Sequence, residues 1–149
     1  MDPSQTVAPR FQKIEGGLYL GPQPSRQDLE DARRHGVRTV IDLRAPAETV
    51  TPNGALVTTA GLDYVNVPVN KAALSQGLID RLDEVMQQKQ GPFLMHCATG
   101  ARAAMLVALR KAQQNRWNAE RTLDGAALMG FDLRATPDFA SFIKVAADN

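Results

Sequence analysis

The chain has 149 residues, of which 44% are hydrophobic and only 5% aromatic, so a mainly aliphatic core within one globular domain is expected. Seventeen basic and sixteen acidic residues give a net charge of +1, and no run of like charge favours binding to nucleic acid or to an anionic membrane. A single cysteine excludes an intramolecular disulfide, and no cluster of His, Asp or Glu has metal-ligand spacing. We therefore expect no metal or other cofactor.

The N-terminal residues 1–10 contain two prolines and are predicted to form a loose arm, with residues 11–149 as a single domain. This segment lacks the layout of a secretion signal, and no stretch of the chain reaches membrane-spanning length, so we expect a cytoplasmic protein. Residues 11–21 predict two short strands around Gly16 and Gly17.

A helix is predicted over residues 22–36, because Ser25 can cap it, Asp28 stands at the capping-box position and Gly36 can end it. The β-branched, apolar run that follows, residues 37–43, is typical of a central strand buried on both faces.

The rest of the chain continues this alternation of strands and helices. Helices are predicted over 54–60, 76–89 and 101–112 and strands over 63–69 and 92–96, with at least one more helix before the C-terminus. The order indicates an α/β fold whose mostly parallel central sheet is flanked by helices. Ligands of such sheets bind beyond the carboxyl ends of the strands, which is where Cys97 lies.

The segment from Cys97 to Arg102 joins a strand to a helix and has the residues of an anion-binding loop. Unpaired amides and the helix dipole at a helix N-terminus favour a thiolate and an oxyanion. Gly100 permits the backbone to curl around an anion, and Arg102 can form two parallel hydrogen bonds with it. The alternative is that Cys97 is a buried structural cysteine.

In these residues the chain resembles the cysteine-dependent phosphatases, especially the dual-specificity and tyrosine phosphatases. It is most similar to a bacterial branch of phosphatase-like domains related to the N-terminal domain of β-lactamase-hydrolase-like proteins. The resemblance rests on "GGLYLGPQPSRQDLEDARRHGVRTVIDLRAPAE" (16–48), "GLDYVNVPV" (61–69) and "FLMHCATGARA" (93–103), in that order and spacing.

This resemblance implies a phosphatase-like fold and a phosphorylated protein or small molecule as substrate. It implies that Cys97 is the nucleophile that forms a phosphocysteine, that Arg102 binds the phosphoryl oxygens and that His96 braces the loop. The implied phosphate-binding amides are those of Ala98, Thr99, Gly100, Ala101 and Arg102.

Three features of this sequence depart from the family pattern. Four residues separate Cys97 from Arg102, whereas phosphatases have five and rhodanese-type sulfurtransferases have four. Ala103 stands where a Ser or Thr commonly helps to release the thiolate. Asn70 stands where an aspartic general acid is expected, and an amide cannot supply a proton as a carboxylic acid does.

Asp42 and Arg44 end a predicted central strand at the edge where the loop should lie. Arg44 could steer an anionic substrate and Asp42 could anchor the loop or an arginine. The alternative is a structural salt bridge with Glu48 or with a neighbouring helix.

Three functions remain open on these grounds. The first is a hydrolase that cleaves a phosphomonoester through a cysteinyl-phosphate. The second is a sulfurtransferase that carries a persulfide on Cys97, and the third is a catalytically weak phosphate-binding or anion-binding module. The sequence predicts neither the substrate nor the oligomeric state.

Overall fold

The computed structural model describes residues 11–15, 17–45 and 53–148, so the predicted arm lies outside the described residues. A five-stranded sheet with the order β1-β2-β5-β3-β4 forms its centre. Only β1 is antiparallel to its neighbour, so the predicted α/β fold with a mostly parallel sheet is confirmed. The strands are β1 (Gln12–Glu15), β2 (Leu18–Gly21), β3 (Thr39–Asp42), β4 (Asp63–Asn66) and β5 (Phe93–His96).

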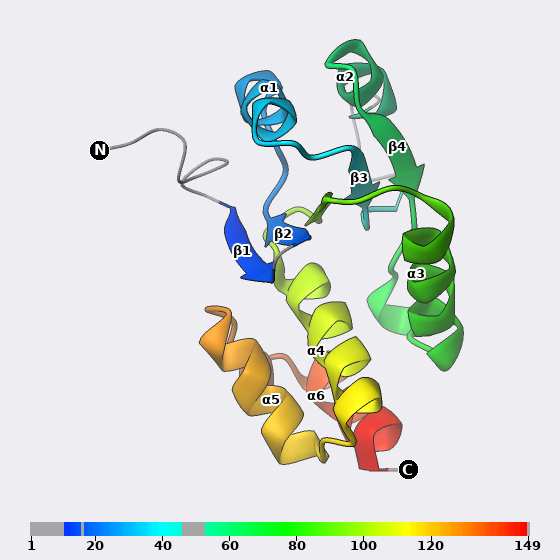
Figure 1. The fold of residues 1–149 in the computed structure, drawn as a ribbon. Coiled ribbons are helices and arrows are strands. Elements are labelled where there is room, and N and C mark those ends of the chain that lie inside the picture. Colours follow the sequence, from blue (N-terminus) through cyan, green and yellow to red (C-terminus); the bar gives the residue numbers. More distant parts are fainter. Residues whose placement is uncertain (1–10, 16, 46–52, 149) are drawn as a thin grey trace.

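The helices form two layers around this sheet (Figure 1). Helices α1 and α2 cover one face, α3 and α4 cover the other, and α5 and α6 pack against α4. Their bounds are α1 (Arg26–Arg34), α2 (Asn53–Thr59), α3 (Gln76–Gln88), α4 (Ala101–Asn115), α5 (Ala119–Leu128) and α6 (Pro137–Asp148), with 3₁₀ turns η3 (Lys71–Ala73) and η4 (Leu133–Ala135).

Helix α1 has the predicted capping box. The Asp28 amide donates to the Ser25 hydroxyl at 3.1 Å, and the Ser25 amide donates to the Asp28 carboxylate at 2.8 Å. Such a cap stabilises a helix by about 1 kcal/mol. Gly36 follows the helix with a φ of +92°, a left-handed conformation that glycine adopts without strain. Local chemistry thus explains where α1 begins and ends.

The register of the sheet places four strand ends in one row. Gly21 of β2 pairs with His96 of β5, His96 pairs with Asp42 of β3, and Asp42 pairs with Asn66 of β4. Because these four strands are parallel, the row lies at the carboxyl edge of the sheet, where α/β proteins bind ligands. Asp42 and His96 are both fully buried there.

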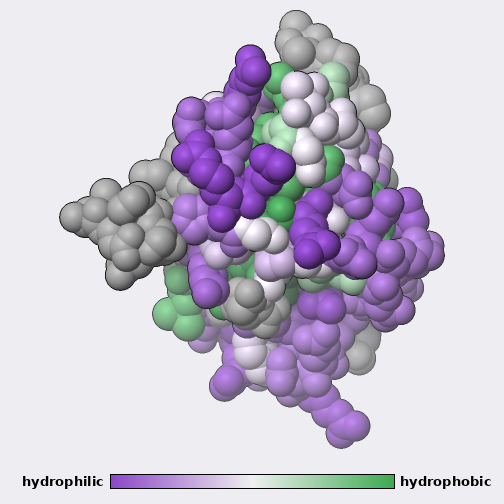
Figure 2. All heavy atoms as spheres, turned by 45° about the horizontal axis from the view of Figure 1, so that its top comes forward, coloured by the Kyte–Doolittle hydropathy of each residue, from purple (hydrophilic) through white to green (hydrophobic). Residues whose placement is uncertain are grey.

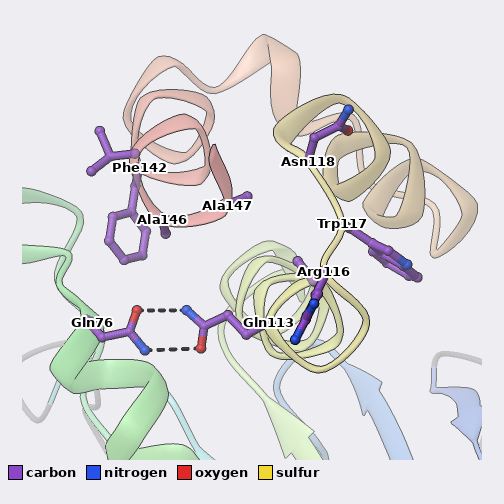
Figure 3. A pocket seen from close by; sticks show the side chains of 10 residues that line it. Gln76, Gln113, Arg116, Trp117, Asn118, Phe142, Ala146 and Ala147 are labelled. Atoms are coloured by element: carbon purple, nitrogen blue, oxygen red, sulfur yellow. Dashed lines mark hydrogen bonds between the residues drawn. The ribbon is translucent and has the colours of Figure 1, made fainter. Parts of the chain in front are cut away.

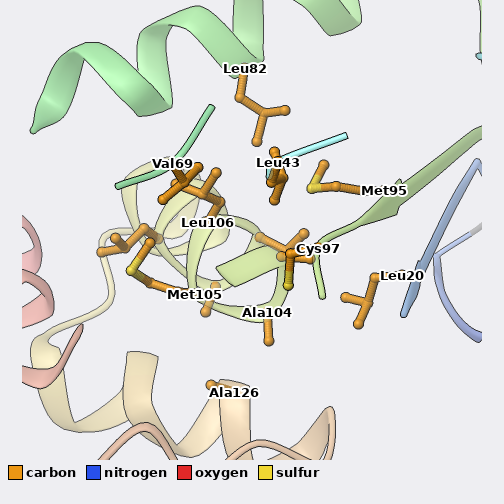
Figure 4. Packing of buried hydrophobic residues seen from close by; sticks show 14 of the residues in the cluster. Leu20, Leu43, Val69, Leu82, Met95, Cys97, Ala104, Met105, Leu106 and Ala126 are labelled. Atoms are coloured by element: carbon orange, nitrogen blue, oxygen red, sulfur yellow. The ribbon is translucent and has the colours of Figure 1, made fainter. Parts of the chain in front are cut away.

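Hydrophobic residues fill both faces of the sheet. The cluster beneath α1 and α2 includes Leu29, Val40 and Leu94, and the larger one lies towards α3, α4, α5 and α6. Figure 4 shows part of the larger cluster, in which Cys97 lies among aliphatic side chains. Cys97, the candidate nucleophile, is therefore part of the hydrophobic core.

The predicted element bounds differ from the observed ones at a few ends. Strand β3 is shorter than the predicted 37–43, and β4 ends at Asn66, two residues before Pro68, a residue that cannot donate to a sheet. Helix α4 continues three residues past the predicted Ala112, because the polar residues after it are compatible with a helix.

The face that carries α1 and α2 is mainly hydrophilic, with small hydrophobic areas between the charged side chains (Figure 2). Among the described helices none combines the length and hydropathy needed to cross a bilayer.

Candidate functional site at the carboxyl end of β5

The loop between β5 and α4 brings the cysteine to the start of a helix. Gly100 is the N-cap of α4, and its amide donates to the Cys97 sulfur at an N···S distance of 3.0 Å. The sulfur atom therefore faces the N-terminus of α4, where backbone amides lack partners within the helix. Cys97 is 1% exposed and lies just below the surface of the loop.

Gly100 is required by the shape of the loop. Its φ is +105°, and a Cβ atom there would lie 2.7 Å from the Phe131 ring and 3.4 Å from the Gly21 carbonyl carbon. Phe131 from the segment after α5 and Gly21 from β2 thus pack directly against the turn. The sequence predicted this need for glycine but not the two neighbours.

A pocket of about 510 Å³ opens above the loop. Residues of the loop and of three other parts of the chain line it: Ala45, Val69, Asn70, Ala98, Thr99, Ala101, Arg102, Thr136 and Phe139. Cys97 and Gly100 are buried and are not among the residues that line the pocket. The predicted loop residues therefore form the wall of one cavity together with residues that follow β3, β4 and η4.

Arg102 is held at the mouth of the loop by the chain after β4. Its Nη1 donates to the Val69 carbonyl oxygen at 3.2 Å. Asn70, the next residue, caps η3, since its Oδ1 accepts a hydrogen bond from the Ala72 amide at 2.9 Å. The arginine and the asparagine thus share one wall of the pocket.

Behind the loop, Asp42 and Arg44 form a buried ion pair. The Nε and Nη2 atoms of Arg44 each donate to one carboxylate oxygen of Asp42 at 3.1 Å. The Tyr64 hydroxyl donates to the same carboxylate at 2.9 Å. The Asn66 side chain donates to the carbonyl oxygens of Asp42 and Arg44 at 2.7 and 2.9 Å. These hydrogen bonds fix the backbone of residues 42–44, which directly precede Ala45 in the pocket wall.

Burial and hydrogen bonds together determine the pKa values of Asp42, Tyr64 and His96 in this cluster. Burial opposes ionisation of Asp42, but the hydrogen bonds from Arg44, the proximity of His96 and the hydrogen bond from Tyr64 together outweigh it, so the pKa of Asp42 lies below its usual value. Burial, followed by the bond to Asp42, raises the pKa of Tyr64 to about 12. Burial lowers the pKa of His96 to about 4, although Asp42 acts in the opposite direction.

His96 is consequently neutral at pH 7. Its Nε2 lies 3.9 Å from Oδ1 of Asp42, which is beyond hydrogen-bond distance, and because His96 is neutral the two do not form a charged pair. The His96 carbonyl oxygen accepts a hydrogen bond from the Leu43 amide at 2.8 Å. This bond ties the residue before Cys97 to the end of β3.

The structure brings the predicted site residues together in two layers. The loop residues and Arg102 lie at the pocket, and His96, Asp42 and Arg44 lie behind it. Arg44 is 3% exposed, and its guanidinium group is bound to Asp42. Asp42 thus anchors an arginine, as one of the predictions had it, and little of the Arg44 side chain is accessible to a substrate. The proposed partner Glu48 lies outside the described residues.

A larger hollow of about 730 Å³ lies at the opposite end of α4 (Figure 3). There Gln76 and Gln113 donate hydrogen bonds to each other at 3.1 and 2.7 Å, and Trp117, Phe142 and Ala146 form other parts of the wall. Its lining contains no cysteine, histidine or carboxylate among the described residues. The smaller pocket is the better candidate for chemistry, because Arg102 and the loop residues that directly follow Cys97 line it.

No group of three or more His, Cys, Asp or Glu in residues 11–15, 17–45 and 53–148 is arranged to hold a metal ion. Cysteine and arginine at a helix N-terminus are instead suited to nucleophilic attack on a bound oxyanion.

Comparison with known proteins supports this interpretation. Residues 10–114 match the family described as "Beta-lactamase hydrolase-like protein, phosphatase-like domain". The chain belongs to this family. A curated relative, the beta-lactamase hydrolase-like protein of Xylella fastidiosa strain 9a5c, is 30% identical over 129 residues, which are 83% of this chain and 30% of the relative. The chain thus spans about a third of the length of the curated relatives that it matches.

Solved structures share the fold of this phosphatase-like domain. A DUF442 protein from Shewanella putrefaciens CN-32 is 24% identical with a TM-score of 0.76, covering 93% of this chain and 89% of that one. The core catalytic domain of the PP-IP phosphatase SIW14 from S. cerevisiae is 21% identical with a TM-score of 0.71, covering 91% and 83%.

The family match ends at residue 114, so α5, η4 and α6 lie beyond it. Thr136, which follows η4, and Phe139 of α6 line the pocket and were not predicted as site residues. No local motif marks them, because only the packing of α6 against the rest of the domain brings them to the loop.

Proposed function

We propose that this domain hydrolyses a phosphomonoester through a cysteinyl-phosphate on Cys97. The observation that carries the proposal is the unit made by Cys97, the Gly100 amide 3.0 Å from its sulfur and Arg102 on the first turn of α4. Membership of a phosphatase-like family supports the same chemistry. The cytoplasm is the compartment we propose, because a catalytic thiol must stay reduced.

The reaction takes place in two steps. The Cys97 thiolate attacks phosphorus, an S–P bond forms, and the P–O bond to the leaving group breaks while that oxygen takes a proton from water. A second water then attacks phosphorus, the S–P bond breaks, and inorganic phosphate and the thiolate are released. Arg102 donates to the non-bridging oxygens, whose charge grows in the transition state.

The type of phosphomonoester belongs to the same proposal. Phe139, an aromatic residue in the pocket lining, is 3% exposed and presents almost no ring surface to a ligand. We therefore propose that the scissile phosphoryl group is recognised by its oxygens, with no required contact to a phosphotyrosyl ring.

A second candidate is sulfur transfer, favoured by the four-residue spacing between Cys97 and Arg102. The Cys97 thiolate would attack the outer sulfur of thiosulfate, the S–S bond would break, and sulfite would leave. Cyanide would then take the outer sulfur of the resulting persulfide as thiocyanate and regenerate the thiolate. The third possibility, an anion-binding module, predicts neither reaction.

The test compares the wild-type chain with Cys97→Ser in two assays, one with para-nitrophenyl phosphate and one with thiosulfate plus cyanide. Intact mass after acid quenching distinguishes an added phosphoryl group from an added sulfur atom. The proposal requires cysteine-dependent phosphate release and the phosphoryl adduct. Phosphate release that survives Cys97→Ser contradicts it, and thiocyanate formation without phosphate release assigns the second candidate.

Arg102→Ala is the second arm of this test, with Arg81→Ala as a control. Arg81 is an exposed arginine on α3. Loss of a transition-state donor lowers kcat by about 10²-fold to 10³-fold. We expect this loss for Arg102→Ala and no change for Arg81→Ala, and equal activity of the two variants would exclude Arg102 as the oxyanion clamp.

A further inference from the structure

Asn70 lies beside the proposed oxyanion clamp. It lines the same pocket as Arg102 and Thr99. It also follows Val69 directly, and the Val69 carbonyl oxygen accepts the hydrogen bond from Nη1 of Arg102 at 3.2 Å. Asn70 therefore lines the same pocket as the arginine that is proposed to bind the oxyanion and directly follows the residue that this arginine contacts.

The orientation of the Asn70 amide follows from its hydrogen bond. The side-chain oxygen Oδ1 accepts from the Ala72 amide at 2.9 Å, and this bond caps η3. A flipped side chain would place the NH₂ group against another donor, so the cap requires the oxygen in this position. The nitrogen Nδ2 is then the remaining polar atom of the side chain, with two N–H donors and no acceptor within the described part of the chain.

Nδ2 of Asn70 and the guanidinium group of Arg102 can only donate hydrogen bonds, so together they suit a ligand that accepts them. An oxyanion can accept from both groups, and a hydrogen bond to a charged acceptor is about twice as strong as one to a neutral acceptor. We propose that Nδ2 of Asn70 donates a hydrogen bond to the oxyanion that Arg102 binds. This inference rests on the proposed function. It makes Asn70 a binding residue, which transfers no proton during the reaction.

Asn70→Asp is the most selective test, because it exchanges the donor for a carboxylate oxygen and keeps an acceptor for the Ala72 amide. The chosen probe is inorganic phosphate, and its Kd is measured by calorimetry at pH 7. Asn115→Asp is the matched control, since Asn115 lies at the opposite end of α4 and donates to the Lys111 carbonyl oxygen.

We expect Asn70→Asp to weaken phosphate binding by about 10-fold to 100-fold, because one hydrogen bond to a charged group is lost and the new carboxylate repels the oxyanion. The unfolding transition in urea should stay at its wild-type midpoint, and Asn115→Asp should bind like wild type. An unchanged Kd in Asn70→Asp means that Asn70 only caps η3 and overturns the inference.

Kinetic measurements distinguish a third role for residue 70, that of a general acid, from oxyanion binding and from capping of η3. If Asn70 occupied the place of a general acid, Asn70→Asp would raise kcat/KM for a phosphomonoester with a poor leaving group and add a basic limb to the pH profile. That result overturns the inference, as does a wild-type chain that fails to bind phosphate. Phosphate binding without phosphatase activity contradicts the proposed function alone, and the two Kd values still decide the role of Asn70.

Discussion

Arg44 and Asp42, which are separated in sequence by Leu43 alone, form two parallel hydrogen bonds of 3.1 Å in the interior of the domain, behind the candidate loop. A buried ion pair is costly to break from one side, because the remaining charge stays desolvated without its partner.

We therefore predict that Arg44→Met lowers the free energy of unfolding by about 3–5 kcal/mol. The measurement is urea denaturation followed by circular dichroism. Arg134→Ala is the control, because Arg134 pairs with Glu120 and Asp124 at the exposed surface, where ion pairs add little. Similar midpoints for the two variants would show that the buried pair does not stabilise the fold.

The depressed pKa of His96 predicts a loss of stability in acid. Below pH 6.5 the unfolded chain binds a proton at this residue, whereas the folded chain resists it down to about pH 4. Stability should thus fall as the pH decreases through this window, by about 3 kcal/mol in total. Stability measured from pH 7 to pH 4 checks the slope.

His96→Gln is the variant that isolates this effect, since glutamine does not titrate. Its stability should vary less with pH than that of the wild type between pH 6.5 and pH 4, whatever its absolute value. The same slope in both proteins would assign the acid sensitivity to other groups.

Gly100→Ala should disrupt the loop. The φ of +105° disfavours any other residue, and the new Cβ would meet the Phe131 ring at 2.7 Å. Backbone strain of this kind costs about 1–3 kcal/mol. We expect lower stability and loss of phosphate binding by calorimetry, while Gly17→Ala, where a Cβ meets nothing within 4 Å, should retain binding. Undiminished phosphate affinity in Gly100→Ala would contradict the assigned loop geometry.

Thr136→Val tests whether the C-terminal part of the chain contributes to the site. Thr136 lines the pocket opposite residues of the loop, and valine removes the hydroxyl with little change in shape. One neutral hydrogen bond is worth about 1 kcal/mol, so KM for para-nitrophenyl phosphate should rise by roughly 5-fold. Thr59→Val on α2 is the control, and equal KM values would restrict the site to residues before α5.

The sequence was sufficient for the parts of the fold that local chemistry decides. The capping box of Ser25 and Asp28 begins α1, and Gly36 ends it, as predicted. The ends of two strands differ from the prediction. The predicted strands 37–43 and 63–69 include residues whose backbone groups form hydrogen bonds outside the regular sheet. In each case tertiary hydrogen bonds decide the bounds.

For the site, the sequence placed Cys97 and Arg102 on one turn and Asp42 at the same edge of the sheet. It did not predict that Tyr64 and Asn66 would bind the Asp42 segment, because that depends on the register between β3 and β4. Thr136 and Phe139 were missed for a similar reason, since the packing of distant helices brings them to the pocket. Contacts between distant elements depend on strand register and helix packing, which local patterns in the sequence do not reveal.

The order of the sheet has a consequence for biosynthesis. β5 is the last strand to be made, yet it lies between β2 and β3 and pairs with both. Until residue 96 has left the ribosome, these two strands present unpaired edges, which are sites of aggregation in nascent chains. Because Cys97 directly follows β5, the strand that closes the sheet also brings the first residue of the candidate loop to the carboxyl edge of the sheet, before the helix that completes the loop has been made.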